Sequence, residues 1–182
     1  MGRDILRRPH GYRTRRSPDS PIQRLVVNDI APEVPLPALW RVSRYMHEDR
    51  RFADLERVEA HLRVTLAPFG PMTDADWRHM ARTSVIECGD GLRLAFDPGI
   101  SRNARRSSLL IHLSLWRYWD RITCPVLILR GARSDFLTPR LLERMCRRLP
   151  HAEVIEFEGI GHAPTLNSGE QIDILQDWLE TT

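Results

Sequence analysis

The sequence contains no lysine: all 27 of its basic residues are arginine. Residues 1–20 hold six arginines and two acids, so the rest of the chain, with 21 arginines and 22 acids, is close to neutral. A nucleic-acid-binding domain needs a basic face. The composition therefore predicts no nucleic-acid partner, and the arginine bias is typical of GC-rich coding.

Long apolar runs are absent as well. No segment approaches the roughly 18 apolar residues that span a bilayer, and the N-terminus does not resemble a secretion signal. The chain is therefore expected to have no membrane partner and to be cytoplasmic. Its 182 residues, of which 42% are hydrophobic, are enough for a packed core.

The chain has few cysteines and no recognisable metal-ligand cluster. Cys88, Cys124 and Cys146 are odd in number and widely spaced, which argues against a disulfide framework and against a Cys-x-x-Cys metal site. The seven histidines form no His-x-x-x-His pattern. We therefore expect neither a metal ion nor another cofactor.

Three short apolar runs predict buried strands, over residues 24–28, 125–130 and 153–157. A helix is expected after the second run, with Thr138 as its N-cap and Pro139 at its first position, and another over residues 170–179. Alternation of strand and helix is typical of a right-handed parallel sheet. The predicted fold class is α/β, with three parallel strands.

About 100 residues separate the first strand from the second, and their pattern is mostly helical. Thr73 and Asp76 form a capping-box pattern at the start of one helix, and residues 88–97 are predicted to form a small hairpin or an extended arm. The predicted organisation is an irregular basic segment (1–20), a core (21–35 and 120–182) and a helical insertion (36–119).

Two residues at the ends of predicted strands suggest catalysis. Asp135 follows the second strand, and His162 follows the third within Gly-Ile-Gly-His-Ala-Pro. The carboxyl ends of neighbouring parallel strands meet at one edge of a sheet, where a carboxylate could hold a histidine in one tautomer. We expect Asp135 and His162 to face each other as two members of a nucleophilic triad, although a turn carboxylate and a surface histidine would show the same pattern.

Other residues have two open interpretations. Asp29, directly after the first strand, is either a secondary catalytic acid or a strand-ending residue that hydrogen-bonds nearby backbone. Four tryptophans could line an apolar substrate pocket or belong to a helical core: Trp40, Trp77, Trp116 and Trp119.

These motifs resemble the C-terminal part of the α/β-hydrolase fold, as in esterases, epoxide hydrolases and carbon–carbon bond hydrolases. The resemblance covers residues 21–180: residues 24–33 resemble the sixth strand, residues 126–135 the seventh strand and acid loop, and residues 159–164 the histidine loop. It implies a partial α/β-hydrolase fold in which residues 36–119 form a lid, and hydrolysis of an ester or related small-molecule bond by a Ser-His-Asp mechanism.

The Gly-x-Ser-x-Gly elbow that presents the family's nucleophile does not occur in this sequence. Advancing the reading frame of residues 2–16 by one nucleotide permits such an elbow, so residues 1–20 are hypothesised to be out of frame. The chain is expected to be truncated and inactive alone, with an exposed sheet edge that invites self-association or a strand-donating partner chain. The alternative function is a non-catalytic module that binds a partner chain or a small apolar ligand.

Overall fold

The computed structural model describes residues 21–45, 50–89, 91–96 and 114–181, without the side chains of residues 40 and 42–45. The chain divides into two compact units. The first, here called the sheet unit, comprises Met1–Val34 and Leu113–Thr182; the second comprises Pro35–His112. The hypothesis about residues 1–20 lies outside the described residues.

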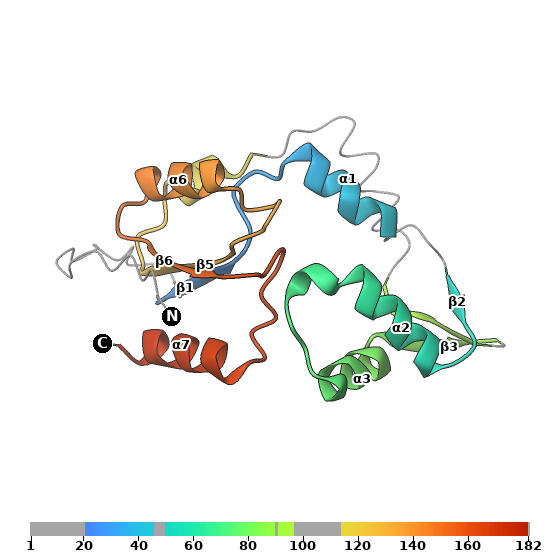
Figure 1. Ribbon diagram of the computed structural model, residues 1–182. Coiled ribbons are helices and arrows are strands. Elements are labelled where there is room, and N and C mark those ends of the chain that lie inside the picture. The colour runs from blue at the N-terminus through green and yellow to red at the C-terminus, as the bar shows by residue number, and fades with distance from the viewer. Residues whose placement is uncertain (1–20, 46–49, 90, 97–113, 182) are drawn as a thin grey trace. The chain divides into compact units, whose positions relative to one another are not determined.

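Three parallel strands form the sheet unit (Figure 1): β1 (Leu25–Asn28), β5 (Val126–Gly131) and β6 (Glu153–Phe157), in the order β1-β5-β6. Val27 lies opposite Ile128, which in turn lies opposite Val154. The α/β class with three parallel strands, predicted from the apolar runs, is confirmed.

The central strand β5 is buried along its whole length because helices cover both faces of the sheet. Successive side chains of a strand point to opposite faces. Accordingly, Val126 and Ile128 join the apolar cluster that includes residues of α6, whereas Leu127 and Leu129 pack with Trp178 of α7. This two-sided burial explains the unbroken apolar run in the sequence.

The described part of this unit contains three helices: α5 (Trp116–Trp119), α6 (Pro139–Arg148) and α7 (Gly169–Glu180). Helices α6 and α7 lie on opposite faces of the sheet (Figure 1). The Thr138 side chain accepts a hydrogen bond from the amide of Leu141, and Pro139 opens α6 as predicted. Ser168 caps α7 in the same way.

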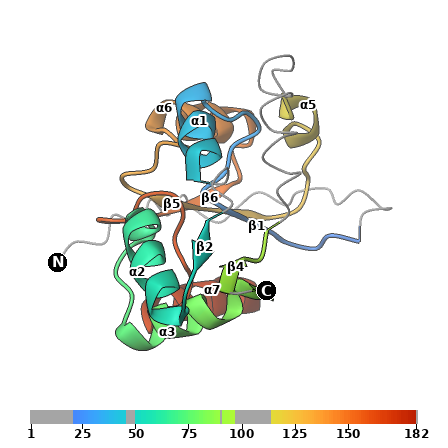
Figure 2. The ribbon, with the colours of Figure 1, turned by 90° about the vertical axis from the view of Figure 1, so that its right-hand side faces the viewer.

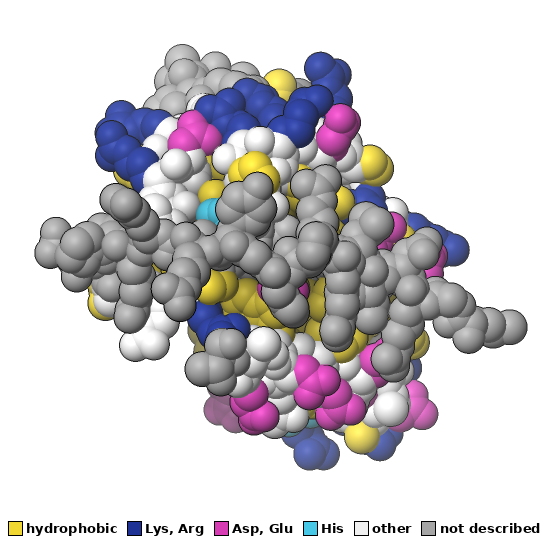
Figure 3. Space-filling view, turned by 90° about the vertical axis from the view of Figure 1, so that its left-hand side faces the viewer, with side chains coloured by type: hydrophobic (Ala, Val, Ile, Leu, Met, Phe, Trp, Pro, Cys, Tyr) yellow, Lys and Arg dark blue, Asp and Glu magenta, His cyan; other side chains and the backbone are white. Residues whose placement is uncertain are grey.

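The two covering helices carry opposite charge (Figure 3): α6 contains four arginines and α7 four carboxylates. Three of the α6 arginines pair with carboxylates of the same unit: Arg144 with Glu33 at 3.0 Å, Arg148 with Asp120 at 2.5 Å, and Arg147 with Glu143 of the same helix at 3.1 Å. The hydrogen bond from Arg148 holds the pKa of Asp120 below its ordinary value. Part of the arginine excess on α6 is therefore neutralised locally.

The second unit combines helices with a small antiparallel sheet. Helices α2 (Leu55–Thr65) and α3 (Asp74–Thr83) lie side by side (Figures 1 and 2). The strands pair in the order β2-β4-β3. The other described elements of this unit are α1 (Leu36–Tyr45), β2 (Arg51–Phe52), the 3-10 helix Ala67–Phe69, β3 (Val85–Cys88) and β4 (Gly91–Leu94). The hairpin expected from the sequence is β3–β4.

One boundary differs from the sequence-based expectation. Residues 113–119 were assigned to the helical insertion, but they belong to the sheet unit. Trp116 and Trp119 of α5 pack in the same apolar cluster as Ile128 and Met145. Helical periodicity shows that a helix is amphipathic but not which unit receives its apolar face.

The capping box of α3 predicts a pH-dependent contribution to stability. Asp76 accepts hydrogen bonds from the Thr73 hydroxyl and amide, and these bonds lower the Asp76 pKa. A carboxyl group whose pKa is lowered by folding stabilises the folded protein at pH values above its unfolded-state pKa, which is about 3.9 for aspartate. This contribution is lost as the pH falls through the pKa of the folded state.

Asp76→Asn should therefore reduce the pH dependence of the unfolding temperature between about pH 6 and about pH 3. The control is Asp173→Asn, which changes a carboxylate on α7 of the other unit. Equal pH dependence in the wild type and Asp76→Asn would show that the capping box contributes nothing to it.

Candidate functional site

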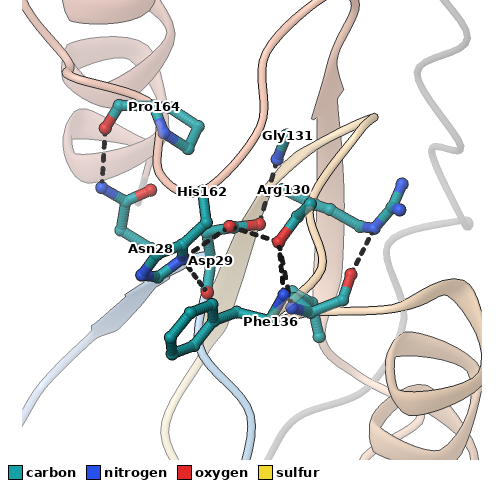
Figure 4. A network of polar contacts seen from close by, with 9 residues as sticks. Asn28, Asp29, Arg130, Gly131, Phe136, His162 and Pro164 are labelled. Carbon is teal, nitrogen blue, oxygen red and sulfur yellow. Dashed lines mark hydrogen bonds and ion pairs between the residues drawn. The ribbon is translucent and has the colours of Figure 1, made fainter. Parts of the chain in front are cut away.

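The ends of the three parallel strands bring together residues that are far apart in the sequence (Figure 4). Asp29 follows β1, Gly131 ends β5 and His162 lies on the loop after β6. The amide of Asp29 donates to the carbonyl of Leu129 at 2.8 Å, which continues the ladder between β1 and β5. Asp29 has a φ of 53°, a left-handed conformation that aspartate tolerates better than most residues.

Asp29 and His162 are in direct contact. The Nδ1 atom of His162 lies 2.9 Å from Asp29 Oδ2 and 3.1 Å from the Asp29 carbonyl oxygen. A carboxylate and a carbonyl oxygen can only accept hydrogen bonds, so the ring proton must sit on Nδ1. This tautomer leaves Nε2 with an unshared electron pair, which is the state of a general base.

The Asp29 side chain is fully buried, with 0% of its surface exposed, and protein donors hold both of its oxygens. The amide of Gly131 donates to Oδ1 at 3.1 Å, and the hydroxyl of Ser134 donates to Oδ2 at 2.6 Å. Together with His162, three donors surround this carboxyl group, an arrangement that suits the ionised form.

The imidazole of His162 is also held by a ring contact. Phe136 stacks on it with ring centroids 3.8 Å apart and an angle of 11° between the planes. The His162 side chain is 21% exposed, so one part of the ring faces outward. Within the described ranges, no hydroxyl or thiol hydrogen-bonds to Nε2 of His162. That nitrogen is therefore available to accept a proton.

Two further side chains, those of Asn28 and Arg130, fix the loops that carry these groups. Asn28 donates from its side chain to the carbonyl of Pro164 at 3.0 Å, which ties the end of β1 to the histidine loop. The buried side chain of Arg130 donates to the carbonyls of Leu137 at 2.6 Å and Ala132 at 3.1 Å, and it pairs with Glu156. The loop after β5 is therefore braced on both sides of Ser134.

The sequence-based pairing of Asp135 with His162 is not the one that the structure forms. Asp135 is exposed, whereas the carboxylate at Nδ1 of His162 is that of Asp29. In the irregular loop after β5, Ser134 turns inward to Asp29 and its neighbour Asp135 turns outward. Asp29 follows a strand and accepts a backbone N–H, as the strand-ending interpretation expects, and it also contacts His162. Its role as a catalytic acid stays a prediction.

Ser134, Gly131 and Phe136 were not identified from the sequence as site residues. The Ser-Asp dipeptide did not indicate which of its two residues faces the site. For Asp29, the signal available in the sequence was its position directly after a strand. In the structure, this aspartate is the one that contacts His162.

Three of the four tryptophans considered for a substrate pocket lie in packed cores. Trp77 belongs to the cluster between α2 and α3, and Trp116 and Trp119 pack against α6; each is 5–6% exposed. The indole of Trp119 donates to the carbonyl of Met145 at 3.2 Å. The side chain of Trp40 lies outside the described part of the chain.

The described residues contain neither a cluster of metal ligands nor a helix that could cross a membrane. Within these ranges, no three His, Cys, Asp or Glu side chains gather as ligands for a metal ion. None of the helices in the described part has the length and apolar character needed to cross a bilayer.

Comparison with known proteins confirms the resemblance seen in the motifs. A model of the alpha/beta hydrolase family matches residues 6–173, a range that begins within the basic N-terminal segment. The 3-hydroxybutyrate-oligomer hydrolase of Cupriavidus necator is 33% identical over 165 residues, which cover 86% of this chain and 56% of that protein. The chain thus spans little more than half the length of this relative.

Solved structures agree. An alpha/beta hydrolase from Novosphingobium aromaticivorans is 28% identical with a TM-score of 0.74, over 87% of this chain and 57% of that one. E-2-(acetamidomethylene)succinate hydrolase shares the fold with a TM-score of 0.73 and is 21% identical in sequence. The match covers 88% of this chain and 58% of that hydrolase chain. The chain therefore belongs to the alpha/beta hydrolase family.

Proposed function

We propose that this chain carries the acid and base of a serine-type ester hydrolase, with Asp29 as the acid and His162 as the general base. The observation that carries the proposal is the 2.9 Å contact between Nδ1 of His162 and the buried carboxylate of Asp29. It supports a base at Nε2 whose positive charge the carboxylate can stabilise after proton transfer.

The proposed reaction follows from this geometry. A serine hydroxyl attacks the ester carbonyl carbon while Nε2 of His162 takes its proton, and the protonated ring then gives that proton to the departing alcohol. Water attacks the acyl-enzyme in the same manner, releasing the carboxylic acid and restoring the serine. Throughout, Asp29 keeps the proton on Nδ1 and remains a carboxylate.

We propose that the nucleophile lies outside the described residues. In support, no hydroxyl within them hydrogen-bonds Nε2 of His162. For the substrate we propose the ester bonds of short 3-hydroxybutyrate oligomers. Support comes from the Cupriavidus necator relative, which is named for this activity and matches 86% of the chain.

The test is an ester-hydrolysis assay with 3-hydroxybutyrate dimers and p-nitrophenyl butyrate. Two preparations are compared: the 182-residue chain alone, and the chain co-expressed with the part of the Cupriavidus necator hydrolase that the match leaves uncovered. Turnover is expected in the second preparation. His162→Ala should lower it by about 10⁴-fold or more because the general base is lost.

His151→Gln is the matched control, because His151 hydrogen-bonds the Cys124 carbonyl within the same unit. These two residues precede β6 and β5, at the end of the parallel sheet opposite to Asp29, which follows β1. The His151→Gln variant should retain turnover near the wild-type level. Turnover that His162→Ala leaves unchanged, or none in either preparation, would contradict the proposal. An absence of turnover in both preparations, together with co-purification of a strand-donating partner chain, would favour the non-catalytic module.

A further inference from the structure

We propose that Ser134 is a positioning residue that holds the Asp29 carboxylate in register with His162. Its role in catalysis rests on the proposed function, but its effect on His162 can be measured without turnover. The hydroxyl of Ser134 lies 2.6 Å from Asp29 Oδ2, the oxygen that faces Nδ1 of His162.

The direction of the Ser134 proton is determined by its other partners. A serine hydroxyl has one proton to donate and two lone pairs to accept with. Both lone pairs are engaged, by the amide of Phe136 at 3.1 Å and the amide of Leu137 at 3.0 Å. The single proton is therefore left to point at Asp29, and rotation about the side chain would break three hydrogen bonds at once.

Ser134 thereby joins two groups that set the geometry of the base. Its hydroxyl orients the carboxylate that holds Nδ1–H, and it also accepts from the backbone of Phe136, whose ring stacks on the imidazole of His162. The residue is 6% exposed, so water does not readily replace its hydroxyl. With Ser134 removed, the Gly131 amide and His162 would be the described donors left to the Asp29 carboxyl.

The test measures the exchange of the Nδ1 proton of His162 with water, by NMR of the full chain at a pH where the ring is neutral. Ser134→Ala is expected to speed this exchange about tenfold. A change of this size corresponds to the loss of one hydrogen bond to a charged group. Ser134→Thr, which keeps both the donor and the acceptors, should restore slow exchange.

Thr138→Ala is the structural control. Thr138 also accepts a backbone N–H at the end of the same loop, but it caps α6 and has no contact with Asp29 among the described residues. It should lower stability without changing the exchange at His162. If Ser134→Ala does not fold, Ser134→Cys, similar in size and a weaker donor, should show the same change to a smaller extent.

Wild-type exchange in Ser134→Ala, or in Ser134→Cys where that variant is used, would overturn the positioning role. So would an equal acceleration in Thr138→Ala. Because the readout needs no substrate, failure of the ester assay leaves this result standing as a property of the Asp29–His162 pair. Conversely, a normal ester assay with unchanged exchange would retain the hydrolase proposal and remove Ser134 from it.

Discussion

Asp29→Asn is expected to move the proton of the neutral His162 ring from Nδ1 to Nε2. The Gly131 backbone amide donates to Oδ1 of Asp29 and cannot rotate away, so we expect an asparagine at this position to keep its carbonyl oxygen there. The Ser134 hydroxyl, which donates to Oδ2, loses its acceptor in this orientation. The NH₂ group of the asparagine then takes the place of Oδ2 and donates toward Nδ1 of His162. A nitrogen that accepts a hydrogen bond carries no proton, so Nε2 becomes protonated and can no longer act as a base.

The tautomer can be read from long-range ¹H–¹⁵N NMR spectra of the neutral ring. In the co-expressed preparation, turnover should fall by about 10⁴-fold, as expected when a base is held in the wrong tautomer. Asp135→Asn is the matched control: it makes the same chemical change at the exposed carboxylate and should leave both the tautomer and turnover as in the wild type. If Asp135→Asn changed the tautomer and turnover while Asp29→Asn left both unchanged, Asp135 would be the acid. That result would falsify the assignment of Asp29.

Gly131→Ala is expected to unfold the histidine loop or the whole sheet unit. A Cβ atom at position 131 would lie 2.1 Å from the carbonyl oxygen of Gly161 and 2.6 Å from that of Ile160. Both obstacles are backbone atoms, so no side-chain rotation can relieve the overlap. The residue after Gly161 is His162, and any displacement of this loop pulls the imidazole away from Asp29.

We expect Gly131→Ala to lower the free energy of unfolding by about 3 kcal/mol or more, toward the upper end of overpacking effects. Chemical denaturation of the chain would measure the loss. Gly169→Ala is the control, because a Cβ there meets no atom within 4 Å and the residue opens α7. That variant should be neutral or slightly more stable. Similar unfolding curves for the two variants would show that the close backbone approach at Gly131 does not exclude a larger side chain.

Much of the fold could be predicted because the relevant signals are local. The run at 126–129 is apolar at every position because β5 is buried on both faces, and such burial favours an unbroken apolar run. Thr138 with Pro139, and Thr73 with Asp76, predicted helix starts because a cap involves residues a few positions apart. The boundary of the second unit was less accurate, since the destination of Trp116 and Trp119 depends on residues of α6 and β5.

The candidate site was predicted in part. His162 and Asp29 were both recognised from their places after strands, but the acid role was given to Asp135. Two carboxylates after neighbouring parallel strands satisfy the same pattern. Only the course of the loop after β5, braced by Arg130 and turned so that Ser134 faces inward, determines which one reaches the imidazole.

The sequence by itself determined the parallel α/β core, the helix starts and the placement of a histidine and two carboxylates at strand ends, because periodicity and capping act over a few residues. The tertiary structure decided that Asp29 rather than Asp135 meets Nδ1 of His162, and that Ser134 and Gly131 hold that carboxylate. The physical reason is range: these hydrogen bonds join residues 102 to 133 positions apart, and their geometry exists only after the strands have paired.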